Sequence, residues 1–97
     1  MTPLAALVYV IDDDDAVRDS LGFLLQSIGL ECELYASALE FLEHYDERLH
    51  SCLVSDIRMP GLSGLELQQI LNERKAAIPI VFITGHGDVP MAVAAMK

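Results

Sequence analysis

The chain has 97 residues and carries 6 Lys and Arg against 15 Asp and Glu, a formal net charge of −9. Its hydrophobic fraction of 53% is enough for a buried core and excludes intrinsic disorder, and its length fits one domain. The acidic balance argues against direct binding of nucleic acid, which requires clustered Lys and Arg.

Membrane and secretory classes are also disfavoured. The longest apolar run, residues 4–11, is far shorter than the roughly 20 residues of a membrane span. The first residues lack the basic region and cleavage site of a secretory signal. Cys32 and Cys52 match neither a disulfide framework nor a zinc pattern. We therefore expect a cytoplasmic α/β domain with no membrane association.

The first half of the chain alternates between strand-like and helix-like segments. Residues 5–11 are apolar and rich in β-branched side chains, which is typical of a strand buried on both faces. Residues 16–28 have apolar side chains at helical spacing, namely Val17, Leu21, Leu24, Leu25 and Ile28. Gly29 follows, where a left-handed C-cap fits. Residues 31–36 alternate and indicate a strand with one exposed face, and Ser37 opens a capping box and a helix through about Tyr45.

The second half continues the alternation. Residues 51–55 predict a third strand, which Asp56 ends. Ser63 opens a second capping box and a helix. The apolar stripe expected on that helix is Leu65, Leu67, Ile70 and Leu71. Residues 78–84 predict a fourth strand with Pro79 near its start, and residues 88–97 a last helix beginning around Asp88 and Pro90.

This β-α-β-α-β-α-β-α order predicts a doubly wound parallel sheet with helices on both faces. Ligands of such sheets bind outside the carboxyl ends of the strands. The first strand ends in four aspartates, 12–15, the third in Asp56 and the fourth in Thr84. If the first and third strands are neighbours, two or three carboxylates converge, and Mg²⁺ is the cation that suits such an oxygen-only site. One of these carboxylates could then accept a phosphoryl group.

Each of these residues also has a simpler explanation. An Asp run before a helix most often caps it, a single Asp after a strand is usually a turn residue, and Thr84 can be an ordinary strand end. The two cysteines fit small core positions. His44, His50 and His86 fit the surface. The coincidence of several such residues at one edge of the sheet favours the functional interpretation.

Three segments resemble the receiver domains of two-component response regulators, and in particular the FixJ-like regulators with a LuxR-type output domain. These segments are residues 8–14, residues 56–61 followed by Gly64, and residues 83–93. The resemblance covers nearly the whole chain. It implies a flavodoxin-like (CheY-like) parallel sheet with strand order 2-1-3-4, and a signalling phosphoacceptor rather than an enzyme with turnover.

The resemblance also implies a role for each matching residue. Asp56 resembles the phosphoacceptor, and Asp12 and Asp13 the acidic pair that holds Mg²⁺. The backbone carbonyl of Arg58 would supply a further metal ligand, and Thr84 resembles the switch hydroxyl. Asp14 and Asp15 then remain caps of the first helix. The implied partner is a sensor histidine kinase.

The chain departs from the family pattern after Lys97. The family's fifth strand with its aromatic residue, its Lys-Pro step and its fifth helix are not in the sequence, so the fifth βα unit and the output domain are expected to be missing. Lys75 and Lys97 are not placed to substitute for the family's Lys. Truncation is the explanation we favour over an incomplete gene product or an exchange of elements with a partner. Residues 80–83 would then form an exposed sheet edge, where a homodimer could form, as it could through the last helix.

Two other classes of function remain open. One is a non-phosphorylated interaction or dimerisation module, for which Asp56 would be dispensable. The other is an enzyme of the same topology, either a flavin carrier or a phosphatase. The acidic residues after the first strand would repel a flavin phosphate, and no separate general acid for a phosphatase is evident.

Overall fold

The structure is a computed structural model that describes residues 7–83. Four parallel strands form one sheet in the order β2-β1-β3-β4. The strands are β1 (Leu7–Ile11), β2 (Glu31–Tyr35), β3 (Ser51–Asp56) and β4 (Ile80–Ile83). The helices are α1 (Asp15–Ser27), α2 (Ala38–His44) and α3 (Gly64–Glu73).

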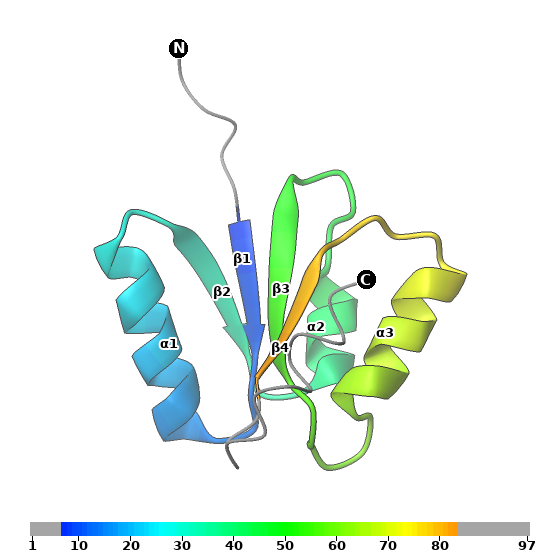
Figure 1. Cartoon of the computed structure of the whole chain (residues 1–97), viewed down its shortest axis with the longest axis horizontal. Helices are drawn as coiled ribbons and strands as arrows, with labels where there is room; N and C mark the ends of the chain where they lie inside the picture. The colour runs from blue at the N-terminus through cyan, green and yellow to red at the C-terminus, as the bar shows by residue number, and fades with distance from the viewer. Residues whose placement is uncertain (1–6, 84–97) are drawn as a thin grey trace.

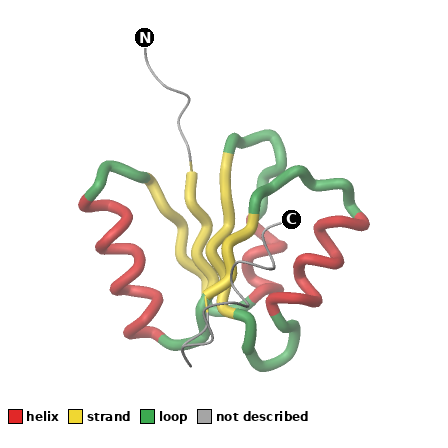
Figure 2. The backbone as a smooth tube through the Cα atoms, viewed as in Figure 1, coloured by secondary structure: helices red, strands yellow, loops and turns green. Residues whose placement is uncertain are grey.

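The helices flank the sheet on both faces. Helix α1 lies on one side and helices α2 and α3 on the other, with the strands between them (Figures 1 and 2). The α/β class and the predicted 2-1-3-4 order are confirmed. Thr84, His86 and the helix predicted over residues 88–97 lie outside the described residues.

The helix ends follow the predicted capping chemistry with one difference. The Asp14 carboxylate accepts hydrogen bonds from the N–H groups of Ala16 and Val17 at 2.9 and 3.2 Å, so Asp14 is the N-cap and Asp15 begins helix α1. The Ser63 capping box before α3 is complete. At Ser37 the box is partial, because the Glu40 carboxylate accepts from the N–H of Ala36, one residue too early.

The main core fills the face under helices α2 and α3. Tyr9 of β1 packs edge-on against Phe41 of α2, with ring centroids 5.0 Å apart, and Phe41 stacks on Tyr45. Tyr9 also contacts the ring of Tyr35. Because β-strand side chains alternate, Val8 and Val10 are buried on the opposite face, under α1. Strand β1 is therefore buried on both sides, as its composition predicts.

Some expected core positions are exposed. Leu65 is 47% exposed, whereas Leu67 and Leu71 of the same helix are fully buried. Residues two apart differ by about 200° around a helix, so Leu65 and Leu67 cannot share a face. Val17 and Leu24 of α1 and its C-cap residue Ile28 are exposed, because buried Gly22 is the point at which α1 meets the sheet.

The cysteines are likewise less buried than expected. Cys32 and Cys52 are free thiols and only half-buried, on strands that flank Val8 on either side. His44 and His50 are exposed, as predicted.

Phe41 tests the aromatic core directly. Phe41→Ala removes a fully buried ring that contacts three other aromatic rings, and we expect it to lower the free energy of unfolding by about 3–5 kcal/mol. Phe23 of helix α1 is 76% exposed, so Phe23→Ala is the matched control, expected within about 0.5 kcal/mol of the original chain. Urea denaturation followed by circular dichroism measures both. Equal losses would contradict this placement of the core.

Candidate functional site

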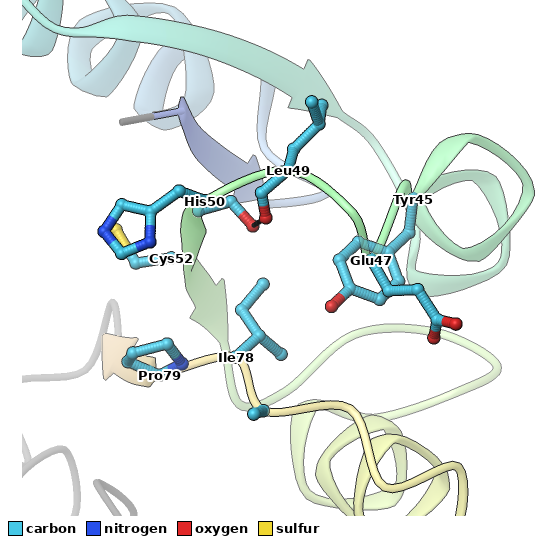
Figure 3. Close-up of a pocket in the computed structure, with 9 residues that line it drawn as sticks. Tyr45, Glu47, Leu49, His50, Cys52, Ile78 and Pro79 are labelled. Atoms are coloured by element: carbon cyan, nitrogen blue, oxygen red, sulfur yellow. Dashed lines mark hydrogen bonds between the residues drawn. The ribbon is translucent and has the colours of Figure 1, made fainter. Parts of the chain in front are cut away.

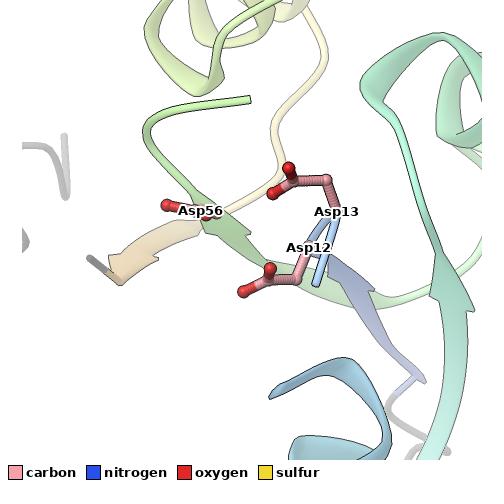
Figure 4. Close-up of side chains that lie close together, drawn as sticks. All are labelled: Asp12, Asp13 and Asp56. Carbon is pink, nitrogen blue, oxygen red and sulfur yellow. The ribbon is translucent and has the colours of Figure 1, made fainter. Parts of the chain in front are cut away.

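Three carboxylates meet at the carboxyl edge of the sheet. Oxygens of Asp12, Asp13 and Asp56 all lie within 4.8 Å of one another (Figure 4). Asp12 is buried, Asp56 is half-buried and Asp13 is exposed. The cluster therefore opens to solvent on one side and rests on the sheet on the other.

The strand register explains why these carboxylates are close. The last paired residues of strands β1 and β3 are Ile11 and Ser55. Asp12 and Asp56 come one residue later on each strand, and neighbouring strands are about 4.8 Å apart. Parallel pairing of two apolar strands thus places the carboxylates side by side.

Backbone and side-chain hydrogen bonds hold the β1–α1 loop. The N–H of Asp12 donates to the carbonyl of Tyr35 on strand β2 at 3.1 Å. The Asp12 carboxylate accepts from the N–H of Asp14 at 2.9 Å. The Asp12 carbonyl accepts from the guanidinium of Arg18 at 2.8 Å. Asp12 is therefore held through its amide, its carbonyl and its side chain.

The loop after strand β3 is held by a close approach of backbone. The Asp56 carboxylate accepts from the N–H of Arg58 at 3.2 Å, and the N–H of Gly64 donates to the carbonyl of Ile57 at 2.9 Å. A Cβ on Gly64 would lie 2.5 Å from the Asp56 carbonyl oxygen and 2.7 Å from the Phe82 ring. Only glycine lets the start of helix α3 sit this close to Asp56.

Gathering these charges has an electrostatic cost. Burial raises the pKa of Asp12 above its usual value of 3.8, and the nearby charges of Asp56, Asp13 and Asp14 raise it further. The hydrogen bond from Asp14 acts in the opposite direction. Ionising Asp12 therefore costs more in the fold than in a free carboxylic acid, and a nearby cation would lower that cost.

The donor set fits a hard divalent cation. The three ligand groups are carboxylates, and one of them faces solvent. Mg²⁺ prefers oxygen ligands and keeps several waters, so an open site with few carboxylates suits it. A cation there would offset the repulsion that raises the pKa of Asp12.

The structure brings together some of the predicted site residues. Asp12, Asp13 and Asp56 converge as expected, and the N–H of Arg58 contacts Asp56. Thr84 is outside the described residues. Arg18 was not among the predicted site residues. Its place one turn after the N-cap Asp14 was the available signal, since that spacing turns a side chain back toward the preceding loop.

A second cavity lies away from the acidic cluster and lacks a comparable group of carboxylates. It has a volume of about 380 Å³ and lies at the amino ends of strands β3 and β4 (Figure 3). Its walls are mainly apolar, and they include Tyr45, Leu49, His50, Ile78 and Pro79. Among the described residues, the clustered carboxylates are at the other end of the sheet.

The fold and its acidic edge define a flavodoxin-like domain of the CheY-like class. Residues 8–97 match the family described as the response regulator receiver domain. The chain belongs to this family, whose members are signalling modules of two-component systems. Among the described residues no helix has the length and apolar character needed to cross a membrane.

Individual relatives place the chain near FixJ. It is 54% identical to the transcriptional regulatory protein FixJ of Azorhizobium caulinodans over 95 residues, which cover 98% of this chain and 45% of FixJ. The solved structure of the response regulator StyR is 50% identical with a TM-score of 0.85, over 96% of this chain and 48% of StyR. The chain thus spans less than half the length of these two relatives.

A more distant solved structure is described as a complex with Mg²⁺ and BeF. It is the response regulator TrrA of Thermotoga maritima, 26% identical with a TM-score of 0.77, over 95% of this chain and 82% of TrrA.

Gly64 provides a test of how the Asp56 backbone is positioned. Gly64→Ala forces a Cβ against a backbone oxygen, and we expect it to lower the free energy of unfolding by about 2–3 kcal/mol. The matched control is Gly22→Ala, whose Cβ meets only the end of the flexible Leu34 side chain, at 3.0 Å. Because alanine favours helix, Gly22→Ala is expected within about 1 kcal/mol of the original chain. Thermal denaturation distinguishes the two. If Gly64→Ala leaves the stability unchanged, the start of helix α3 does not lie this close to the Asp56 backbone.

The raised pKa of Asp12 gives a pH test without metal. The native state binds the Asp12 proton more tightly than the unfolded state, so stability is lost as pH rises from 3.8 through the native pKa. Asp12→Asn keeps an oxygen for the N–H of Asp14 and removes the charge. We therefore expect the variant to gain stability over the original chain as pH rises from about 4 to about 7. Urea titrations in a chelating buffer measure this difference; a gain that shrinks with rising pH would contradict it.

Proposed function

We propose that this receiver accepts a phosphoryl group on Asp56 in a Mg²⁺-dependent reaction, with a phosphohistidine of a sensor histidine kinase as the donor. The observation that carries the proposal is the cluster of Asp12, Asp13 and Asp56 at an open sheet edge. The description of TrrA as a complex with Mg²⁺ and BeF supports it, since TrrA shares the fold.

The reaction we propose is a direct transfer to Asp56, whose carboxylate lies in the cluster at the open edge of the sheet. One carboxylate oxygen of Asp56 attacks phosphorus, a P–O bond forms, and the P–N bond to the donor imidazole breaks. The electron pair of that bond goes to the imidazole nitrogen, which takes up a proton. The N–H of Arg58 donates a hydrogen bond to Oδ1 of Asp56 and so orients the carboxylate, which leaves the second oxygen for the attack.

Asp12, Asp13, Asp56 and the Arg58 carbonyl would hold the cation. Mg²⁺ held there would supply positive charge that offsets the charge of the phosphoryl group and of the attacking carboxylate. Asp12 contributes the buried end of the site and Asp13 the exposed end. Their role is to bind and orient.

The phosphoryl group would then control an output. We assign the switch hydroxyl to Thr84 because residues 83–93 resemble the corresponding receiver motif. We assign the output to a transcriptional domain outside residues 1–97, because FixJ is a transcriptional regulatory protein more than twice as long as the aligned region. Dimerisation through the edge of strand β4, or through the helix predicted over residues 88–97, would be a further means of controlling the output. Among the described strands, β4 pairs only with β3, so its other edge is available for such pairing.

Asp56→Asn tests the phosphoacceptor. The amide cannot form the acyl phosphate, so we expect labelling by acetyl phosphate or a phosphorylated kinase to fall to background. Asp19→Asn removes an exposed carboxylate from helix α1 with the same change of charge, and should label normally. Intact mass spectrometry with Mg²⁺, and again with a chelator, measures the phosphoryl adduct.

Two outcomes would reject the assignment. Labelling that survives Asp56→Asn would place the phosphoryl group elsewhere. A chain that takes no label in any form, yet binds partners equally well as Asp56→Asn, would instead be the non-phosphorylated interaction module.

A further inference from the structure

Arg18 is a nearly buried cation beside the acidic loop. Its side chain is 16% exposed, although it lies on the first turns of a surface helix. We propose that Arg18 is a positioning residue, which fixes the Asp12–Asp13 peptide so that the Asp13 carboxylate faces the cation site. This inference rests on the proposed function, because it concerns the residues that would hold Mg²⁺.

The contact is made to backbone rather than to a carboxylate of the cluster. Arg18 Nη1 donates to the Asp12 carbonyl oxygen at 2.8 Å, and Nη2 pairs with the carboxylate of Asp15. The two guanidinium nitrogens therefore join the end of strand β1 to the first residue of helix α1. Arginine suits this because its planar fork presents two donors in a fixed geometry.

Peptide geometry carries this contact to Asp13. The Asp12 carbonyl and the Asp13 N–H belong to one planar peptide unit, so fixing the oxygen fixes the direction in which the chain enters Asp13. Within residues 7–83 the Asp13 carboxylate accepts no hydrogen bond, whereas that of Asp12 accepts one from the Asp14 N–H. The orientation of Asp13 thus depends on its backbone.

Charge alone predicts the opposite effect of Arg18 on a cation. A guanidinium near the site repels Mg²⁺, so removing it should strengthen binding if electrostatics were its only influence. If Arg18 acts by positioning, its removal should weaken binding instead. The sign of the change in affinity therefore separates the two roles.

The experiment is a calorimetric titration of the purified chain with Mg²⁺. Arg18→Met retains much of the stem and removes the fork, and we expect Mg²⁺ affinity to fall roughly 10- to 100-fold, as for other residues that orient metal ligands. Arg18→Lys retains the charge but cannot reach both acceptors as a fork, so we expect a smaller loss. Arg48→Met is the matched control, because Arg48 is 87% exposed and pairs with Asp46 in the α2–β3 loop.

A second readout needs no metal. The Asp14 N–H donates to the Asp12 carboxylate, so in the metal-free Arg18→Met protein we expect faster hydrogen exchange at Asp14, with exchange in strand β3 unchanged. A merely structural role would instead speed exchange throughout and leave Mg²⁺ affinity as it is.

The outcomes separate this inference from the proposed function. If the unaltered chain binds Mg²⁺ and Asp56 is labelled, but Arg18→Met binds Mg²⁺ as tightly or more tightly, only the inference fails. If the unaltered chain neither binds Mg²⁺ nor takes a label, the proposed function fails and the inference with it. If Arg18→Met does not fold, Arg18→Lys decides the question. An unchanged Mg²⁺ affinity in Arg18→Lys would show that the two-donor contact of the guanidinium is not needed, and the inference would fail.

Discussion

Repulsion among three carboxylates is the constraint around which the carboxyl edge of the sheet is organised. One carboxylate oxygen from each of Asp12, Asp13 and Asp56 lies within 4.8 Å of the others. Burial is the largest cause of the raised pKa of Asp12, and the neighbouring charges raise it further. Such an arrangement persists only because the rest of the fold stabilises it. The aromatic and aliphatic core under helices α2 and α3 supplies this stabilisation. It holds strands β1 and β3 side by side, and Asp12 and Asp56, which come at the ends of these strands, are brought together with them.

The site also depends on two backbone contacts that bury no apolar surface. Gly64 has no side chain, so the start of helix α3 can approach the Asp56 backbone. Arg18 is largely withdrawn from solvent to bind a carbonyl oxygen. Both features fix the backbone of the two loops that carry the carboxylates.

Much of the fold could be predicted because its signals are local. Strand β1 is apolar on both faces, Ser63 and Glu66 form a complete capping box, and Gly29 takes a positive φ of 87° after helix α1. The convergence of Asp12 with Asp56 could also be predicted, since it needs only the order of the strands. Helical spacing shows that Leu65 and Leu67 cannot share a face, but which of them is exposed depends on how helix α3 is rotated against the sheet. The carbonyl contact of Arg18 likewise depends on the placement of helix α1, and its position one turn after Asp14 indicates only the direction of the side chain.

The two sides of the acidic cluster are held by different parts of the molecule. Asp56 belongs to the well-packed side, through strand β3 and the close approach of Gly64. Asp12 and Asp13 belong to a loop that helix α1 holds through Arg18, and on the α1 face Val54, Val81 and Ile83 are only half-buried within the described residues. An ion bound by all three carboxylates would join these parts. At a concentration of 100 times its dissociation constant it would stabilise the fold by about 2.7 kcal/mol. The loop that Arg18 holds would couple the ion directly to helix α1, in addition to the packing of α1 on strands β1 and β2.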